Sequence, residues 1–297
     1  MRLRHRRAGL LTETATQCRS NSMALTIESN WDNSSAKSRL VVTDQAGHWY
    51  DEDGNSAHTI IGKNGNERNT TVADARKLGL LPSVTSVLGI MDKPQLTSWK
   101  IEQAIMSSLT LPKEDNETLE EYARRVVKDS KQSTTKAAEH GTIMHEQMEH
   151  ILLGRPHSKD ESLAPYIRTF SRWAKDNVEK TYWCEKALVG AGYAGRCDAY
   201  VRLKGIGDAI IDLKNRKVNP KYDPFYDTDC AQLWAYRIAS ENPKAACVSV
   251  VLASNDPESI RHHVWDEEEL YQAGIAFSAM LKVWSWSKQY VPPGMKL

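Results

Sequence analysis

Between about residues 94 and 180, hydrophobic residues recur with the period of an α-helix. Met144, Met148 and Ile151 follow one another at spacings of three and four residues, and Gly154 comes after them as a stop signal. Pro94 suits the first turn of another helix, because its missing amide proton is not needed there. The predicted helices cover residues 94–106, 114–132, 134–153 and 162–180.

The period changes to that of β-strands after residue 180. Short apolar runs predict three consecutive strands, which are joined by turns at Gly190–Gly192 and Gly205–Gly207. Pro292–Pro293 ends the last predicted helix. The predicted strands cover residues 182–190, 193–204, 208–215, 245–254 and 259–265, and the predicted helices between and after them cover 227–240 and 266–289. We therefore expect one α/β domain over residues 81–297, with a helical N-terminal half.

The first 80 residues follow neither pattern. Residues 1–22 hold five arginines against one glutamate, which predicts a basic disordered extension and is also similar to an organelle transit peptide in composition. Residues 23–80 predict a β-hairpin and loop region, with turns near Ala46–Gly47 and Asp53–Gly54. Within that region, residues 62–79 are expected to form a loop and a short helix.

The amino-acid composition argues against several classes of protein. The 297 residues are 40% hydrophobic and 26% charged, as in an ordinary soluble globular protein, and no apolar run reaches the roughly 18 residues of a membrane span. The five cysteines form no CxxC pair, which argues against a disulfide scaffold, a zinc ribbon or an iron–sulfur cluster. We expect a reduced, intracellular protein, in a bacterial or phage cytoplasm unless the basic N-terminus targets it to an organelle.

The net charge of the chain does not indicate a nucleic-acid-binding protein. The formal charge is +1, and without residues 1–22 the chain keeps 34 basic and 37 acidic residues. A polyanion would therefore be bound by a local basic patch or through metal ions.

The strands at 193–204 and 208–215 carry the candidate chemistry. Alternation puts Asp198 and Tyr200 on one face of the first strand, and Cys197 with Ala199 on the other. If the two strands form a hairpin, Asp198 and Asp212 meet at one end of the sheet, with Lys214 one step beyond. Paired carboxylates bind Mg²⁺ or Mn²⁺, and a neighbouring lysine orients water or stabilises charge on a phosphate. Such a set suits hydrolysis of a phosphodiester.

The Asp-x-Lys pattern alone is weak, since Asp129-Ser130-Lys131 repeats it on a polar helix. An ion pair on an exposed sheet face is the alternative interpretation of Asp212 and Lys214. Asp212-Leu213-Lys214 differs from Asp129-Ser130-Lys131 because its charged residues lie at the end of an apolar strand, Ala209–Leu213. That strand is expected to be buried on both faces.

Two helices offer further candidates. His145 lies beside the apolar stripe of its helix, where it is either a core histidine or a third metal ligand. The segment begins like HExxH, but Glu149 occupies the last position, which disfavours a zinc protease. Gln232 and Tyr236 are four residues apart and project together, either toward DNA or packed over Lys214.

The order of His145, Asp198, Asp212-Leu213-Lys214 and Gln232-x-x-x-Tyr236 resembles the PD-(D/E)XK nuclease superfamily. It is most similar to the RecB-like branch, with its phage exonucleases and the mitochondrial genome maintenance exonuclease. Pro82 to Trp99 is similar to an N-terminal motif of these exonucleases. The resemblance covers about Leu81 to Ala253, and it implies a restriction-endonuclease-like core, a mixed central β-sheet flanked by helices.

The resemblance also implies roles for single residues. The metal ligands would be His145, Asp198, Asp212 and the carbonyl of Leu213, with Asp198, Asp212 and Lys214 catalytic. Glu185 matches an auxiliary acidic position, and the implied DNA-binding residues are Ser83, Thr85, Gln232 and Tyr236. Asn215 departs from the pattern, because a small hydroxyl residue often follows the lysine. The lack of a cysteine cluster argues against the iron–sulfur subgroup.

The leading hypothesis is a DNA exonuclease that uses one or two Mg²⁺ or Mn²⁺ ions in recombination, repair or replication. Its partners would be DNA, single-stranded or with free ends, and a recombination or single-strand-binding protein, without a membrane. A structure-selective endonuclease of the same fold and a non-catalytic nucleic-acid-binding module are the alternatives. Trp99, Trp173 and Trp183 either stack on bases or pack in the core.

Overall fold

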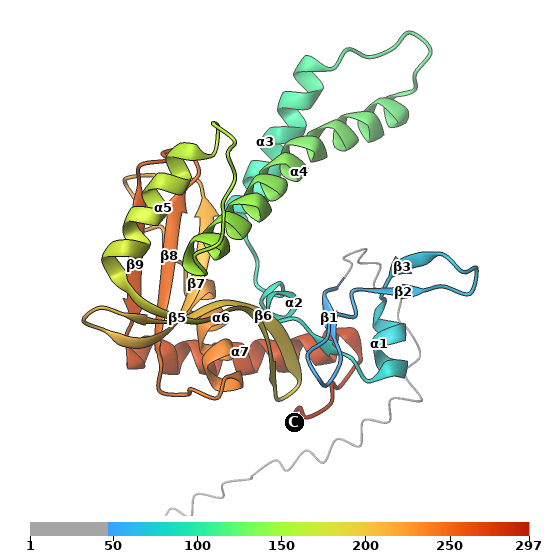
Figure 1. Cartoon of the computed structure of the whole chain (residues 1–297). Helices are drawn as coiled ribbons and strands as arrows, with labels where there is room; N and C mark the ends of the chain where they lie inside the picture. Colours follow the sequence, from blue (N-terminus) through green and yellow to red (C-terminus); the bar gives the residue numbers. More distant parts are fainter. Residues whose placement is uncertain (1–46, 297) are drawn as a thin grey trace, which may run out of the picture. The chain divides into compact units, whose positions relative to one another are not determined.

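The computed structural model of the chain describes residues 47–296 (Figure 1). Its strands are β1 (Trp49–Tyr50), β2 (Thr59–Ile61), β3 (Glu67–Asn69), β4 (Leu81–Pro82), β5 (Val178–Gly190), β6 (Tyr193–Leu203), β7 (Gly207–Arg216), β8 (Ala246–Ala253) and β9 (Ile260–Trp265). Its helices are α1 (Val72–Leu78), α2 (Val84–Leu88), α3 (Pro94–Thr110), α4 (Leu119–Leu152), α5 (Ala164–Asn177), α6 (Asp227–Ala239) and α7 (Glu267–Lys288). Across this described range, no helix is both long and apolar enough to cross a membrane.

A five-stranded mixed sheet forms the centre of the fold, in the order β5-β6-β7-β8-β9. The pairs β5–β6, β6–β7 and β8–β9 are antiparallel, whereas β7 and β8 run parallel and are connected through α6. The mixed α/β class and all five predicted strands are confirmed. So are the turns that join β5 to β6 and β6 to β7, where Gly192, Gly205 and Gly207 adopt positive φ angles.

The sheet is covered on both faces, and each face has its own core. One face packs on α2, α6 and α7, with Ile210, Leu233 and Phe277 among the fully buried residues. The other packs on α4 and α5, with Met148, Phe170 and Ile211 buried there (Figure 1). The middle of β7 is buried on both faces as predicted, since residues from Ala209 to Leu213 are at most 2% exposed.

The two helices predicted for residues 114–132 and 134–153 are wrong, because α4 is continuous over Leu119–Leu152. The stretch between the two predicted helices contains serine and threonine, residue types that often favour turns over helices. Within the helix, however, the Ser130 hydroxyl donates to the carbonyl of Val127 and the Thr135 hydroxyl to that of Lys131. A hydroxyl satisfied by the preceding turn does not interrupt a helix.

The N-terminal strands follow the prediction in part. The turn at Asp53–Gly54 is present, and an antiparallel bridge between Tyr50 and Ser56 closes it. Strand β1 also pairs antiparallel with β4, which places Trp49 opposite Pro82. The hairpin of this region is β2–β3, and β3 lies in a stretch predicted to be a loop. The short helix predicted after it is α1. The turn expected at Ala46–Gly47 begins at a residue outside the described range, as does the basic extension.

Candidate functional site

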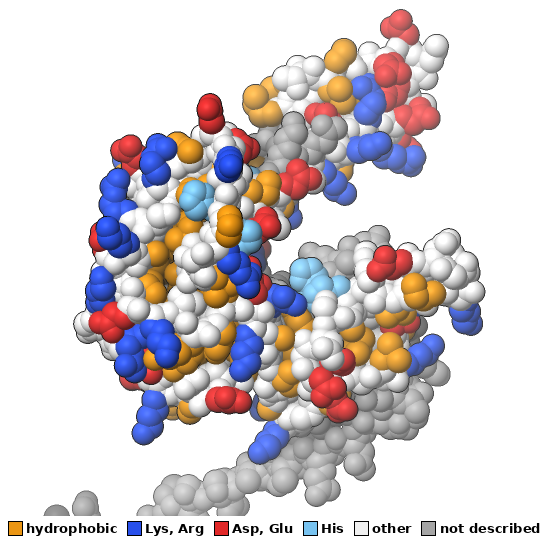
Figure 2. Space-filling model, viewed as in Figure 1, with side chains coloured by type: hydrophobic (Ala, Val, Ile, Leu, Met, Phe, Trp, Pro, Cys, Tyr) orange, Lys and Arg blue, Asp and Glu red, His pale blue; other side chains and the backbone are white. Residues whose placement is uncertain are grey.

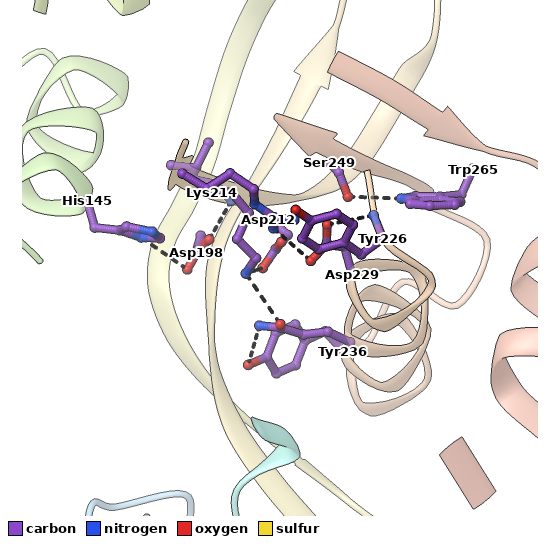
Figure 3. Close-up of polar contacts among 12 residues, drawn as sticks. His145, Asp198, Asp212, Lys214, Tyr226, Asp229, Tyr236, Ser249 and Trp265 are labelled. Atoms are coloured by element: carbon purple, nitrogen blue, oxygen red, sulfur yellow. Dashed lines mark hydrogen bonds and ion pairs between the residues drawn. The ribbon is translucent and has the colours of Figure 1, made fainter. Parts of the chain in front are cut away.

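Asp198 lies where strands β6 and β7 separate. Their last paired residues are Ala199 and Ile211. Beyond that pair, Oδ2 of Asp198 accepts a hydrogen bond of 2.6 Å from the backbone N–H of Leu213, so a side chain replaces a backbone partner (Figure 3). The N–H and C=O of one strand residue point to the same side. The carbonyl of Leu213 therefore faces the same gap as the carboxylate.

The alternation of β6 is broken at Asp198, which corrects the predicted faces. Ala199 packs in the core beneath α4 and α5, but Cys197 lies in the opposite core with Tyr200. On β5 the paired positions pass from Cys184 to Lys186, and Glu185 between them adopts a left-handed φ of 52°. Few residues with a side chain tolerate that conformation, and such residues gather at functional sites.

Three side chains from three elements meet at this irregularity. His145 comes from α4, Glu185 from β5 and Asp198 from β6, and one ligand atom of each lies within 4.8 Å of the others. Nδ1 of His145 is 3.8 Å from Oδ1 of Asp198. Burial lowers the pKa of His145, which keeps the imidazole in the neutral form that binds metals. Burial and the charge of Asp198 raise the pKa of Glu185 to about 7.

The buried carboxylate of Asp212 forms an ion pair with the partly buried ammonium group of Lys214 beside this group. Nζ of Lys214 donates to Oδ1 of Asp212 at 2.6 Å, and Asp212 is 1% exposed. Burial pulls the pKa of Lys214 down, but the carboxylates of Asp212 and Asp198 outweigh it and raise the pKa above its ordinary value. Burial raises the pKa of Asp212 to about 7, and the charge of Lys214 only partly opposes it. Lys214 is therefore charged, but its charge does not fully offset the cost of burying the carboxylate of Asp212.

The residues present fit a divalent cation. Oδ2 of Asp212 is buried and finds no hydrogen-bond partner among residues 47–296, which is costly for a carboxylate unless a cation takes that place. The donors that meet within 4.8 Å of one another beside this ion pair come from Glu185, Asp198 and His145, two carboxylates and a neutral imidazole, and Asp212 lies outside that group of three. Carboxylate oxygens are the ligands that Mg²⁺ and Mn²⁺ prefer.

Helix α6 contributes a side chain that contacts Lys214. Nζ of Lys214 lies 3.3 Å from Oε1 of Gln232, whose amide nitrogen donates to the hydroxyl of Tyr236 at 3.4 Å (Figure 3). Tyr236 is 3% exposed, and its ring closes over Gly195 of β6. Of the two predicted interpretations, the structure displays the packing of this pair against Lys214. A contact of either residue with DNA stays a prediction.

Ser83 and Thr85 lie at the start of α2, which packs on β6 and α6. The buried Ser83 hydroxyl caps the helix by accepting from the N–H of Ser86, and Thr85 is exposed. Their contact with a DNA backbone stays a prediction. The tryptophans divide: Trp173 is buried against Phe170, as the core alternative predicted, and Trp183 packs partly buried on Tyr200.

Sequence reasoning missed a second buried ion pair next to the first. Arg216 donates to Oδ1 of Asp229 at 2.9 Å, and its guanidinium lies 4.4 Å from the ring centre of Tyr226. The negative charge of Asp229 also reaches Asp212 and Lys214. Alternation offered the signal, because Arg216 continues the face of β7 that carries the Asp-x-Lys pair.

Asn215, which departs from the family pattern, is held from two sides. Its amide nitrogen donates to the carbonyl of Leu252, and its Oδ1 lies 3.1 Å from Nδ1 of His140 on α4. Since Oδ1 only accepts, the imidazole of His140 donates through Nδ1. His140 thus contacts β7 whereas His145 faces Asp198 on β6, because residues five positions apart do not lie on the same face of a helix.

No family model and no curated protein matches the sequence of this chain. Among solved structures, an alkaline exonuclease (LHK-Exo) from Laribacter hongkongensis is similar with a TM-score of 0.28 and 14% sequence identity, over 50% of this chain and 80% of that chain. The crystal structure of SSO0001 gives a TM-score of 0.26 and 15% identity, over 62% of this chain and 86% of that chain. Similarities of this size identify no function, which must come from the residues of the site.

Proposed function

We propose that the chain is a metal-dependent deoxyribonuclease that hydrolyses phosphodiester bonds at DNA ends. One observation carries this proposal: Asp198, Asp212 and Lys214 converge where β6 and β7 separate, with an unpartnered oxygen on Asp212. A buried carboxylate set with one ammonium group is an arrangement that costs stability without a cation and suits phosphoryl chemistry with one.

Four side chains and one backbone carbonyl would hold one or two Mg²⁺ or Mn²⁺ ions: Glu185, Asp198, Asp212, His145 and the carbonyl of Leu213. When bound, the metal supplies a lowered pKa for water and positive charge for a phosphate oxygen.

Lys214 acts next to these ligands. Its ammonium group stays charged and is oriented by Asp212 on one side and Gln232 on the other. A fixed donor of this kind stabilises the negative charge that grows on phosphate oxygens during hydrolysis, and it positions the attacking water. Tyr236 acts only through Gln232, as a positioning residue.

The choice of DNA ends rests on the sequence motifs, since the order of the site residues and the Pro82–Trp99 segment are similar to those of RecB-like exonucleases. Recombination, repair and replication are the processes in which such an activity removes nucleotides from ends.

The test is cleavage of labelled oligonucleotides by purified variants. We expect Asp198→Asn, Asp212→Asn and Lys214→Met each to lower the rate by at least about 10³-fold, because each removes charge that the transition state needs. Asp129→Asn and Lys131→Met repeat two of these changes at the same spacing on α4 and should cleave like the wild type. Unimpaired cleavage by Asp212→Asn would exclude the proposed site.

Closed circular DNA separates the proposal from its nearest rival. An exonuclease degrades the linear form of a plasmid and spares the intact circle, whereas a structure-selective endonuclease nicks or linearises the circle. Degradation should require added Mg²⁺ or Mn²⁺ and stop with EDTA. Nicking of the circle at the rate of linear degradation would replace the exonuclease proposal with the endonuclease one.

A further inference from the structure

Two histidine rings stack near the start of β1. The centres of His48 and His58 are 4.6 Å apart, with 16° between the ring planes. The ring of Tyr50 meets His58 edge-on at 5.1 Å. Nδ1 of His58 accepts a hydrogen bond from the backbone N–H of Trp49, so its Nε2 carries the proton and is a donor. In Figure 2, histidine surface lies beside basic side chains in the region where Figure 1 places β1 and β2.

Arg196 connects this pair to the candidate metal group. It lies on β6, two residues before Asp198, and its side chain is 50% exposed. Its one ion pair within the described range is with Glu185, and the 3.9 Å between Nε and Oε2 is longer than a hydrogen bond. Its charge also reaches His58, since burial, His48 and Arg196 all lower the pKa of that imidazole.

The guanidinium of Arg196 and the imidazoles of His48 and His58 therefore lie in one region, since β1 packs on β6 and the charge of Arg196 reaches His58. Burial is the main cause of the lowered pKa of His58, and the nearby His48 and Arg196 add to it, so this region disfavours a further positive charge. A metal ion held by Glu185 would offset the carboxylate charge that faces Arg196. An anion placed beside Arg196 and the two imidazoles would balance the guanidinium charge. A guanidinium with adjacent imidazole donors matches the oxygens of a phosphate group.

We propose that Arg196, His48 and His58 bind a backbone phosphate of the DNA strand next to the phosphate being hydrolysed. This inference rests on the proposed function, because it takes the substrate of the metal group to be DNA. The contact positions the strand without reading its sequence. It gives the N-terminal segment that carries β1 a role in substrate binding, although that segment lies outside the nuclease motifs.

The experiment measures binding in the absence of cleavage. Fluorescence anisotropy with labelled single-stranded 20-mers of oligo(dT) and oligo(dA), in EDTA at pH 6.0, gives the Kd of the full chain as a function of KCl concentration. We expect Arg196→Gln to raise Kd about tenfold on both sequences. The slope of log K against log salt should shrink by about 0.7, the value for one phosphate contact on a single strand. His48→Phe keeps the stacked ring without its donors and should weaken binding in the same direction.

Arg202→Gln is the matched control, because Arg202 lies on the same strand with 49% of its side chain exposed but is bound to Asp208. It should leave Kd and slope unchanged, and Arg196→Lys should keep most of the slope. Equal Kd and slope in the wild type and Arg196→Gln would overturn the phosphate site, even if the wild type cleaves DNA. Failure of the wild type to cleave, with the Arg196 effect intact, would overturn the proposed function instead.

Discussion

The carboxyl group of Asp212 has a different charge preference in the folded chain and in water. Burial raises its pKa to about 7 from an ordinary value of 3.8. A raised pKa in the folded state means that the folded chain holds the proton more tightly than the unfolded chain. This contribution to stability is complete below pH 4 and is lost as the pH rises through 7.

The substitution Asp212→Asn should therefore stabilise the metal-free protein at high pH. Asparagine keeps an acceptor for Lys214 and avoids the buried negative charge. We expect the free energy of unfolding to rise by roughly 1–3 kcal/mol at pH 8.0, and by less at pH 5.0. Urea denaturation in EDTA at the two pH values measures the difference. A variant that is less stable than the wild type at pH 8.0 would contradict this account of Asp212.

Glu185 combines strain with a ligand role, and the two can be separated. A left-handed φ costs a residue with a Cβ roughly 1–2 kcal/mol, and glycine escapes that cost. Glu185→Gly should thus unfold at a higher urea concentration, with a gain of about 1 kcal/mol, whereas Glu185→Ala keeps the strain and should show no gain.

Both Glu185 variants should lose Mn²⁺ affinity in calorimetric titration, because both lack the carboxylate. A gain of stability in Glu185→Ala equal to that in Glu185→Gly would mean that the carboxylate, rather than the backbone, is the source of the cost.

At the scale of elements, two helical glycines have opposite surroundings. A Cβ on Gly274 of α7 would lie 2.4 Å from the ring of Trp234 on α6, while a Cβ on Gly141 of α4 meets nothing within 4 Å. Gly274→Ala should therefore push α6 and α7 apart and destabilise the fold by about 1–3 kcal/mol. Gly141→Ala should stabilise it by about 0.5–1 kcal/mol, because alanine favours the helix. Thermal unfolding followed by circular dichroism checks both, and a shift of the same sign in the two variants would contradict this packing.

The strands and most helices were predictable because their periods are regular. Residues 208–215 stand out by an apolar core that ends in charge, and the sheet built around them is the one expected. The length of α4 was not predictable, since hydroxyl side chains such as that of Thr135 either break a helix or bond to its preceding turn, and sequence does not say which.

The site was predictable only as far as alternation holds. Asp212 and Lys214 share a face of a regular strand, and their proximity follows from that. Asp198 and Glu185 lie at an irregularity of the β5–β6 pair, where a strict period of two gives the wrong face for Cys197. The roles of Gln232 and Tyr236 depended on the distance between α6 and β7, which is a property of packing and not of local sequence.

For the whole molecule, a bound cation should act as a source of stability. The proposed ligand groups come from α4, β5, β6 and β7, so an ion would tie helix α4 to three strands of the sheet. Mn²⁺ at about 100 times its Kd should raise the free energy of unfolding by about 2.7 kcal/mol, seen as a higher Tm.

Asp198→Asn keeps an acceptor for the N–H of Leu213 but lacks the charge, and its Tm should barely respond to Mn²⁺. An equal rise of Tm in this variant would place the ion elsewhere on the protein.

The bond between Asp198 and the backbone of Leu213 also makes the amide proton of Leu213 a natural spectroscopic probe. Its resonance in an ¹⁵N-edited spectrum depends on the electron density of the oxygen that it touches. Anything that draws on that oxygen, whether an ion, a proton or an arriving substrate, would move one assignable peak, so occupancy could be followed in the native chain without attaching a label.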